Sequence, residues 1–192
     1  DLVIHSATKY IDGQGRVLGG VVAGRSDLVS AIVPFMRNAG PTLSPFNAWI
    51  LSKSIETLSV RMDRHCENAM GLALYLENRP EVLYVKYPFL TSHPGYQVAK
   101  KQMRAGGGIV AFELKGGVAA GRQFIDRVKM LSISPNLGDT RSIITHPASS
   151  THSKLTQEQR EQVGITDGLI RVSVGLEHLD DIIADIDQAF GQ

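Results

Sequence analysis

Apolar and polar positions alternate in blocks along this chain, and each block predicts a strand or a helix. A short apolar run over residues 2–4 predicts a first strand that ends in the polar tip Ser6-Ala7-Thr8-Lys9-Tyr10. Turn-forming Asp and Gly residues follow, and a second apolar run over residues 16–23 predicts a returning strand in the same sheet. The polar tip is therefore expected at the edge of a sheet.

Two helices are expected next. Residues 27–36 have a helical pattern that Asn38-Ala39-Gly40-Pro41 closes. A second helix begins at Ser44-Pro45, where a capping hydroxyl precedes a proline at the first helical position. Its apolar residues recur every three or four positions until Arg79-Pro80, which predicts one long helix, straight or bent, on the order of 54 Å in length. Such a helix connects two domains, with a boundary near Pro41.

Beyond residue 80 the pattern is that of a compact α/β unit. Strands are expected over residues 82–85, 109–114, 130–133 and 168–174, and helices over residues 92–105, 121–128 and 179–190, with a further capped helix start at Thr156. Residues 134–154 are rich in Ser, Thr, Pro, Asn and Gly without periodicity, which predicts a loop. A polar loop of that length in a compact domain usually has a function, so it is the second place to look for a site.

Composition narrows the classes of function. The 192 residues include 20 Lys and Arg against 19 Asp and Glu, a balance that offers no basic surface to nucleic acid or to an anionic membrane. With 43% hydrophobic residues the chain can bury a core, and no apolar run approaches the roughly 20 residues of a membrane span. The single Cys66 and the lack of Cys or His pairs at metal-ligand spacing argue against a metal site and for a reducing compartment, so we expect a cytoplasmic protein.

The start of the chain is unusual. Asp1 leads directly into the first apolar strand, without a preceding segment that could supply the neighbours of that strand. Because unpaired strand edges promote aggregation, we expect partner strands that this sequence does not contain. The sequence is therefore expected to be part of a longer protein.

The polar tip carries the first candidate chemistry. An unprotonated lysine amine such as that of Lys9 can attack a carbonyl carbon, and Ser6 and Thr8, two residues apart at a strand end, can donate their hydroxyls to one phosphate. A phosphate beside a lysine that bonds to an aldehyde fits pyridoxal 5′-phosphate. The spacing alone is more typical of a solvated strand end with three surface polar residues. The nearby glycines match neither a dinucleotide fingerprint nor a Walker loop, since Leu18 stands where the fingerprint requires Gly.

Two further candidates lie in the second half of the chain. Arg171 is on the polar face of an apolar strand, where a guanidinium suits bidentate binding of a carboxylate; a structural ion pair is the alternative. Asn136 and the loop that carries Asp139, Arg141, His146 and His152 are polar enough to line a site, although Asn136-Leu137-Gly138-Asp139 also suits a plain turn. The neighbours of His65 on its helix are charged, which favours a solvated side chain.

Several motifs together carry a family resemblance. They are the first ten residues, Gly13-Gln14-Gly15-Arg16-Val17-Leu18-Gly19-Gly20, Gly40-Pro41-Thr42-Leu43-Ser44-Pro45-Phe46-Asn47-Ala48-Trp49, Glu56-Thr57-Leu58, Thr145-His146-Pro147-Ala148, and Gly168-Leu169-Ile170-Arg171-Val172-Ser173-Val174-Gly175-Leu176-Glu177. In this order along the whole chain, they resemble the Cys/Met-metabolism family of pyridoxal-phosphate enzymes. The resemblance covers the C-terminal half of such an enzyme.

The resemblance implies a fold and roles for five residues. The fold is the C-terminal part of the type I transferase fold, in which residues 1–43 are the end of the large cofactor domain and residues 44–192 are a long connecting helix with a small α/β domain. Lys9 matches the lysine that bonds to pyridoxal phosphate, Ser6 and Thr8 match the two phosphate-binding hydroxyls, and Arg171 matches the arginine that holds the substrate carboxylate. Asn136 stands where lyases and cystathionine synthases of the family have Ser.

The same resemblance implies an activity. Asn136 favours the branch that replaces the γ-acyloxy group of an activated homoserine ester, such as O-succinylhomoserine, by sulfide or a thiol in methionine biosynthesis. The alternatives are a methionine γ-lyase, a cystathionine-forming or cystathionine-cleaving enzyme, or a fragment that is inactive without its N-terminal half. The family implies a homo-oligomer, typically a dimer of dimers. The resemblance does not specify which acyl group the ester carries or which sulfur compound accepts the homoserine carbon chain.

Overall fold

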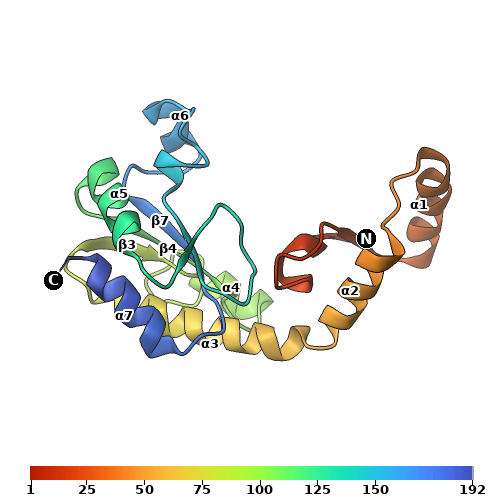
Figure 1. The fold of residues 1–192 in the computed structure, drawn as a ribbon, viewed down its shortest axis with the longest axis horizontal. Coiled ribbons are helices and arrows are strands. Elements are labelled where there is room, and N and C mark those ends of the chain that lie inside the picture. The colour runs from red at the N-terminus through yellow and green to blue at the C-terminus, as the bar shows by residue number, and fades with distance from the viewer. Residues whose placement is uncertain (192) are drawn as a thin grey trace. The chain divides into compact units, whose positions relative to one another are not determined.

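A computed structural model describes residues 1–191 and divides them into two compact units, residues 1–60 and residues 61–191 (Figure 1). The chain order of strands and helices is that of an α/β protein. No helix within the described residues is both long enough and apolar enough to cross a membrane. Because each unit has its own hydrophobic cluster, the two are described separately.

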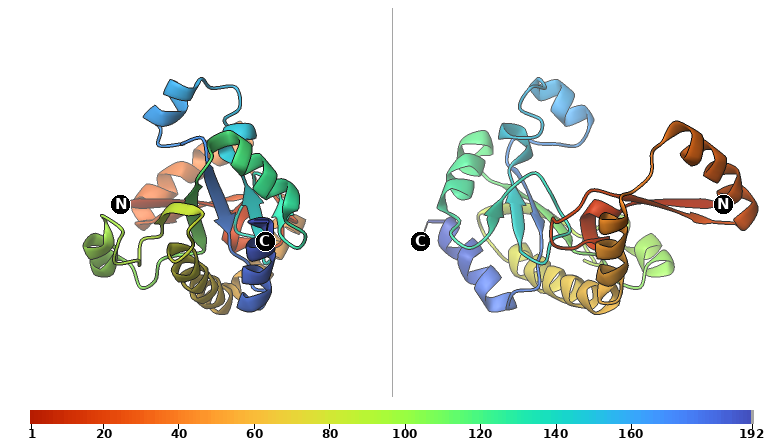
Figure 2. Two further views of the ribbon diagram at one scale, coloured as in Figure 1. Left: turned by 90° about the vertical axis from the view of Figure 1, so that its left-hand side faces the viewer. Right: turned by 45° about the vertical axis from the view of Figure 1, so that its right-hand side comes forward.

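In the first unit, strands β1 (Leu2–Ser6) and β2 (Gly20–Gly24) pair antiparallel, and Ser6 lies opposite Gly20. Helix α1 (Ser26–Ala39) follows and lies beside β2 (Figure 2), and helix α2 (Pro45–Ile55) comes next. Both predicted strands and the helix over residues 27–36 are confirmed. The second strand begins later than expected, because the chain before Gly20 crosses over the polar tip and bonds to it.

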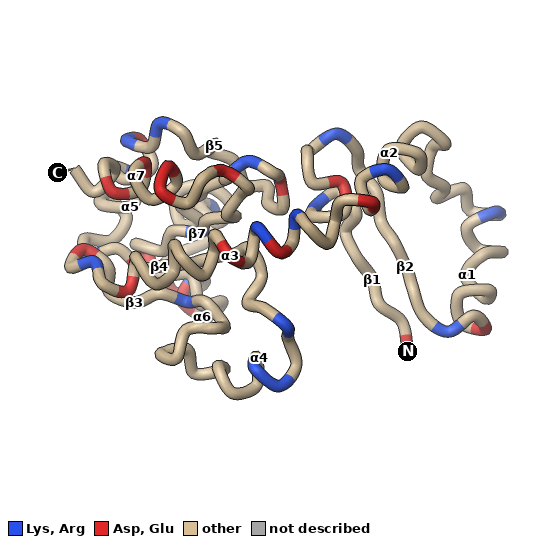
Figure 3. Tube along the Cα trace, turned by 90° about the horizontal axis from the view of Figure 1, so that it is seen from below, with Lys and Arg blue, Asp and Glu red and all other residues tan. Residues whose placement is uncertain are grey.

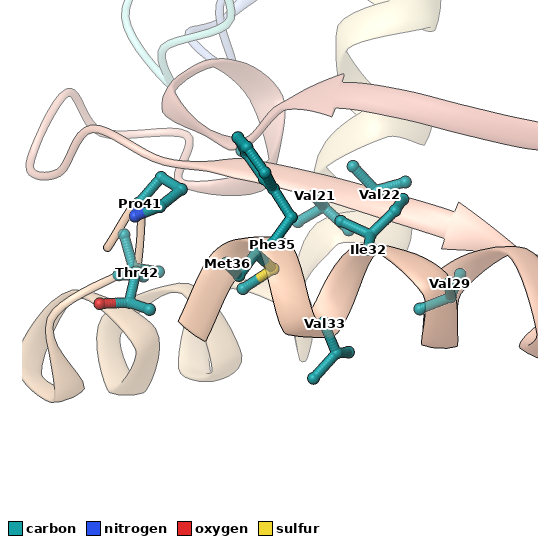
Figure 4. A pocket seen from close by; sticks show the side chains of 11 residues that line it. Val21, Val22, Val29, Ile32, Val33, Phe35, Met36, Pro41 and Thr42 are labelled. Atoms are coloured by element: carbon teal, nitrogen blue, oxygen red, sulfur yellow. The ribbon is translucent and has the colours of Figure 1, made fainter. Parts of the chain in front are cut away.

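The first unit leaves much apolar surface exposed. Ile4 is 77% exposed, Phe35 is 66% exposed, and α1 has no fully buried side chain among its described residues. The two strands carry no Lys, Arg, Asp or Glu (Figure 3). An apolar groove of about 630 Å³ lies between β2 and α1, lined by Val21, Ile32, Met36 and their neighbours (Figure 4). This surface has the composition of a protein interior.

The single long helix expected from residue 44 onward is wrong, because α2 ends at Ile55 and a separate helix α3 (Leu58–Glu77) begins after a turn. The predicted start is confirmed, since the Ser44 side chain accepts a hydrogen bond from Asn47 N at 3.1 Å. At the break, both the backbone N–H and the hydroxyl of Thr57 donate to Ser54 O at 3.2 Å. A threonine hydroxyl that competes for a backbone carbonyl interrupts the regular ladder.

The second unit contains a five-stranded sheet in the order β3-β4-β7-β6-β5. Its strands are β3 (Val82–Lys86), β4 (Ile109–Leu114), β5 (Ser132–Ile133), β6 (Ile143–Thr145) and β7 (Leu169–Ser173). All neighbouring pairs are antiparallel except β5 and β6, which are parallel. The sheet is therefore mixed, with β7 at its centre.

Helices α3, α5 (Gly117–Arg127) and α7 (Leu179–Ala189) bury one face of this sheet (Figure 1). The predicted alternation along β7 is confirmed, because Ile170 and Val172 lie in the core among the side chains of these helices. The aromatic rings of Phe112 and Phe124 meet edge to face at 5.8 Å between centroids. Two shorter helices are α4 (Tyr96–Gln102) and α6 (Gln157–Gln162), and Thr156 caps the second with a capping box.

The loop predicted over residues 134–154 is only partly a loop. It contains β6 and a short 3₁₀-helix, Pro147–Ser149. A strand as short as β6 is hard to detect from sequence, because polar Ser and Thr residues flank two apolar positions. Since β5 and β6 are parallel, residues 134–142 must return from one end of the sheet to the other.

Candidate functional site

The polar tip of the first unit forms a single turn. Strand β1 ends at Ser6, and Ala7–Ile11 forms a short π-helical turn in which the backbone of Lys9 leaves the helical region. The backbone N–H groups of Ala7 and Thr8 both donate to Gly19 O, at 2.9 and 3.3 Å. The strand therefore ends at Ser6, and Thr8 lies in the turn that follows rather than on the same strand.

The hydroxyl of Thr8 is fixed by the chain that crosses the tip. It accepts a hydrogen bond from Gly19 N at 3.1 Å and lies 3.4 Å from Gly19 O. A Cβ at residue 19 would come within 2.9 Å of the Leu51 side chain and 3.5 Å of the Ala7 Cβ, so glycine allows this close approach. Gly19 thus positions Thr8.

An ion pair between the buried Asp12 and the exposed Arg16 anchors the end of the turn. The Asp12 carboxylate accepts hydrogen bonds from Arg16 N at 2.7 Å and from Arg16 Nε at 3.0 Å. Arg16 Nη2 donates in turn to Asp12 O and to Ser54 Oγ, at 3.0 and 2.6 Å. Ala7, Val17 and Leu51 are buried beside this pair. These contacts give the tip a defined shape, and the sequence reasoning did not find them.

The donor set at the tip fits pyridoxal phosphate. Ser6 is exposed at the strand end, and Thr8 and Lys9 are half-buried within the same turn. Two hydroxyls and one primary amine are what a phosphate and an aldehyde on one small molecule require. No group that would oppose an anion lies in the turn, since the Asp12 carboxylate is already bound to Arg16.

In the second unit, Arg171 lies on the sheet face opposite the helices. Its cross-strand neighbours are the small residues Ala111 on β4 and Thr145 on β6. Its Nη2 donates to two loop carbonyls, Pro135 O at 2.8 Å and Asn136 O at 2.9 Å. The predicted pair Asn136 and Arg171 is therefore brought together by a backbone contact.

The loop that carries Asn136 is bonded along its length to the end of β7. Gly138 N donates to Ser173 Oγ at 2.8 Å, and Leu176 N donates to Thr140 O at 2.8 Å. Glu177 bonds to Ser142 at the far end of the loop. Sequence reasoning missed Ser142 and Glu177 as site-related residues, although the motif that ends at Glu177 was a usable signal.

The other polar residues of the loop have structural partners. Asp139 is buried, which on its own raises its pKa, but hydrogen bonds from the Arg141 side chain and backbone outweigh burial and hold the pKa below its usual value. His146 bonds to Ser149 Oγ at 2.8 Å and to Asp167 O at 2.7 Å. His152 bonds to its neighbour Thr151.

The expectation that His65 is solvated is wrong, because its side chain is fully buried. His65 Nδ1 donates to Val174 O at 2.6 Å, and Asn68 Nδ2, one turn along α3, donates to Gly175 O at 3.0 Å. The charged residues beside His65 in sequence lie on other faces of the helix. Burial lowers the pKa of His65 below its ordinary value of 6.5.

This shift predicts a pH dependence of stability. Because the folded pKa of His65 is lowered, the unfolded chain binds more protons between that pKa and pH 6.5, so the free energy of unfolding falls as pH drops below 6.5. The slope is at most about 1.4 kcal/mol per pH unit. Denaturant unfolding between pH 5 and 7.5 measures it. A His65→Asn variant, which keeps a donor for Val174 O, should lose this part of the slope; an unchanged slope would contradict the assignment.

The predicted site residues thus form two groups, Ser6, Thr8 and Lys9 in the first unit and Asn136 and Arg171 in the second. The first unit carries a lysine just after a strand end, and the second is a mixed α/β unit with an arginine on the sheet face opposite its helices. These are features of an α/β protein suited to an organic cofactor and an anionic substrate. The model of the Cys/Met metabolism PLP-dependent enzyme family matches residues 1–191, and the chain belongs to this family of pyridoxal-phosphate enzymes.

Individual relatives agree with the family. The chain is 53% identical over 186 residues to O-succinylhomoserine sulfhydrylase of Pseudomonas aeruginosa, covering 97% of this chain and 46% of that protein. It is 47% identical over 190 residues to an L-methionine gamma-lyase of Fusobacterium nucleatum, covering 98% and 48%. Cystathionine gamma synthase of Xanthomonas oryzae pv. oryzae has a TM-score of 0.93 at 39% identity, covering 99% and 49%. The chain spans about half the length of the curated relatives it matches, and its fold is that of these enzymes.

Proposed function

We propose that this chain is the C-terminal part of a pyridoxal-phosphate enzyme that replaces the γ-acyloxy group of an activated homoserine ester by sulfide or a thiol. In this proposal residues 1–43 belong to the end of the large cofactor domain, and residues 44–192 form the connecting helices and the small domain. The observation that carries the proposal is the single turn that holds Ser6, Thr8 and Lys9, in a chain that is 53% identical to a sulfhydrylase.

The tip residues hold the cofactor. Lys9 bonds to the aldehyde carbon, and the hydroxyls of Ser6 and Thr8 donate to the phosphate. The 3.4 Å contact between Thr8 Oγ1 and Gly19 O is long for a hydrogen bond between oxygens, so a charged phosphate oxygen is the stronger acceptor for that hydroxyl. When bound, pyridoxal phosphate withdraws electrons from the substrate and so makes its Cα–H acidic.

The second group binds the substrate. A guanidinium has five N–H donors, so Arg171 can hold the loop carbonyls and a substrate carboxylate at the same time. Asn136 lies beside it through its carbonyl and offers a neutral side chain near the carboxylate. The amine of Lys9, when free of the cofactor, would act as a general base that removes a proton from Cα and then one from Cβ, so that the γ-acyloxy group can leave with its bonding electrons, and would return protons to these carbons after the sulfur nucleophile has added to Cγ.

The choice among activities rests on similarity and on one residue. The 53% identity to the Pseudomonas aeruginosa sulfhydrylase supports this choice, and Asn136 departs from the Ser expected of lyases. Products decide between them: we expect the full-length protein with O-succinylhomoserine and sulfide to yield homocysteine and succinate. If 2-oxobutanoate and ammonia are the main products under these conditions, the lyase alternative replaces this proposal.

The proposal also covers partners and location. The exposed apolar strands and the groove between β2 and α1 suit cover by the N-terminal half of the same polypeptide, without which residues 1–192 would be an inactive fragment. The complete enzyme is proposed to be a homo-oligomer, a dimer of dimers. Cys66 is a free thiol, which suits a reducing compartment, so we place the enzyme in the cytoplasm.

A further inference from the structure

We propose that Glu177 is a positioning residue for the substrate carboxylate, acting through the loop of residues 134–142 on Arg171. This role rests on the proposed function of Arg171. Glu177 touches neither Arg171 nor Asn136 in the contacts described above, so its effect must pass through the backbone.

The carboxylate of Glu177 fixes the far end of the loop. Its Oε1 accepts from Ser142 N at 2.6 Å, and its Oε2 accepts from Ser142 Oγ at 2.9 Å. Ser142 is 1% exposed, and its hydroxyl accepts in turn from Gly175 N at 2.9 Å. Hydrogen bonds to an ionised acceptor are about twice as strong as neutral ones, so this pair is a strong clamp.

The clamp itself has a rigid base. Two side chains of helix α3 bond to the backbone around Glu177. Asn68 Nδ2 donates to Glu177 O at 2.9 Å, and His65 donates to Val174 O. Space at this point is tight, because a Cβ at Gly175 would lie 2.5 Å from Thr140 O. Glu177 is therefore placed by the core of the second unit and transmits that placement to the loop.

The near end of the loop bears on the guanidinium. Its carbonyls at Pro135 and Asn136 accept both hydrogen bonds that Arg171 Nη2 donates. These two hydrogen bonds help to fix the orientation of the guanidinium while the carbonyls stay in place. A loop released at Ser142 would let Arg171 sample other orientations and bind a carboxylate with lower affinity.

The chain contains a matched control. Glu113 on β4 makes the same kind of clamp elsewhere in the sheet, with Oε1 accepting from Gly168 N at 3.0 Å and Oε2 accepting from Thr166 Oγ1. It bonds to no residue of the loop in the described contacts. Glu177→Gln and Glu113→Gln each place an amide N–H₂ where the carboxylate accepted a hydrogen bond, so both should lower the melting temperature by similar amounts.

The experiment compares two ligands on the full-length holoenzyme by calorimetry. L-norleucine carries the α-carboxylate, and n-pentylamine lacks it. The dissociation constant of n-pentylamine divided by that of L-norleucine therefore measures carboxylate recognition. We expect Glu177→Gln to reduce this ratio about tenfold and Glu113→Gln to leave it unchanged. If Glu177→Gln does not fold, Ser142→Ala gives the same comparison with a smaller reduction, because it removes the hydroxyl contacts to Glu177 and Gly175 N but keeps the hydrogen bond from Ser142 N to Glu177.

Arg171→Ala separates the possible failures. One outcome is that the ratio falls strongly in Arg171→Ala but keeps the wild-type value in Glu177→Gln and Ser142→Ala. This outcome would overturn the role of Glu177 and leave the proposed function standing. An unchanged ratio in Arg171→Ala would overturn the carboxylate site itself, and with it this inference. An equal reduction in Glu113→Gln would also overturn the inference, because the effect would then follow from lost stability.

Discussion

Replacing Lys9 by alanine in the full-length enzyme is expected to lower kcat by about 10³-fold, the largest effect of any single change in this chain. Two proposed functions of one amine would be lost together, namely the bond to the cofactor aldehyde and proton transfer at Cα and Cβ. The neighbouring Ser6 and Thr8 would still hold the phosphate, so the cofactor should remain bound, with weaker affinity. Product formation from O-succinylhomoserine and the near-visible absorption band of the lysine-bound cofactor measure the two losses separately.

Lys53 provides the matched control for this experiment. It lies on α2 in the same unit, and its amine is paired with the exposed Glu56 carboxylate at 2.7 Å. Exposed pairs of this kind contribute little to stability, so Lys53→Ala should leave both the band and the rate unchanged. A Lys9→Ala protein that kept the wild-type band would rule out Lys9 as the cofactor lysine.

The second large effect is expected at Arg171. Arg171→Ala should lower kcat/KM by roughly 10²-fold, because hydrogen bonds to a charged carboxylate are worth about 1.5–3 kcal/mol each. Most of the loss should appear in KM, since the contact is made in the bound ground state as well as in the transition state. Steady-state kinetics with the homoserine ester checks both statements.

The variant Arg160→Ala is the control for Arg171→Ala. It distinguishes the loss of a substrate-carboxylate contact from the loss of an arginine with a structural role. Arg160 donates to Leu155 O at 2.9 Å and to the Asp167 carboxylate at 2.6 Å, so Arg160→Ala removes comparable structural bonds from the second unit. We expect that variant to be less stable with an unchanged KM. If both variants raised KM equally, the effect at Arg171 would be structural.

The sequence predicted those elements whose residues follow one strict period. Strand β4 has the expected bounds, Ile109–Leu114, because its apolar run lies between glycines and a lysine turn. Strand β6 could not be found, since its few residues show no clear period and its antiparallel partner β7 is distant in sequence. The sequence pattern did not predict the break before α3, for a different reason. Apolar spacing continues past Thr57, whereas the helix is interrupted where the backbone N–H and the hydroxyl of Thr57 both bond to Ser54 O.

For the candidate site, the sequence indicated residue types but not their supports. Ser6, Thr8 and Lys9 were found because nucleophile and donors are adjacent in the chain. The contact from Gly19 that fixes Thr8 depends on a chain crossing that no local pattern encodes. His65 was misjudged because charged sequence neighbours describe adjacent helix faces, whereas burial depends on the one face that meets β7.

The parallel pairing of β5 and β6 limits how this protein can evolve. Residues 134–142 return across the sheet in fewer residues than the dozen or more that such a connection usually takes, so the segment has little slack. A deletion there would pull β6 out of register, and an insertion would free Asn136 from Arg171. New substrate preferences in this lineage should therefore arise by exchange of side chains at constant loop length.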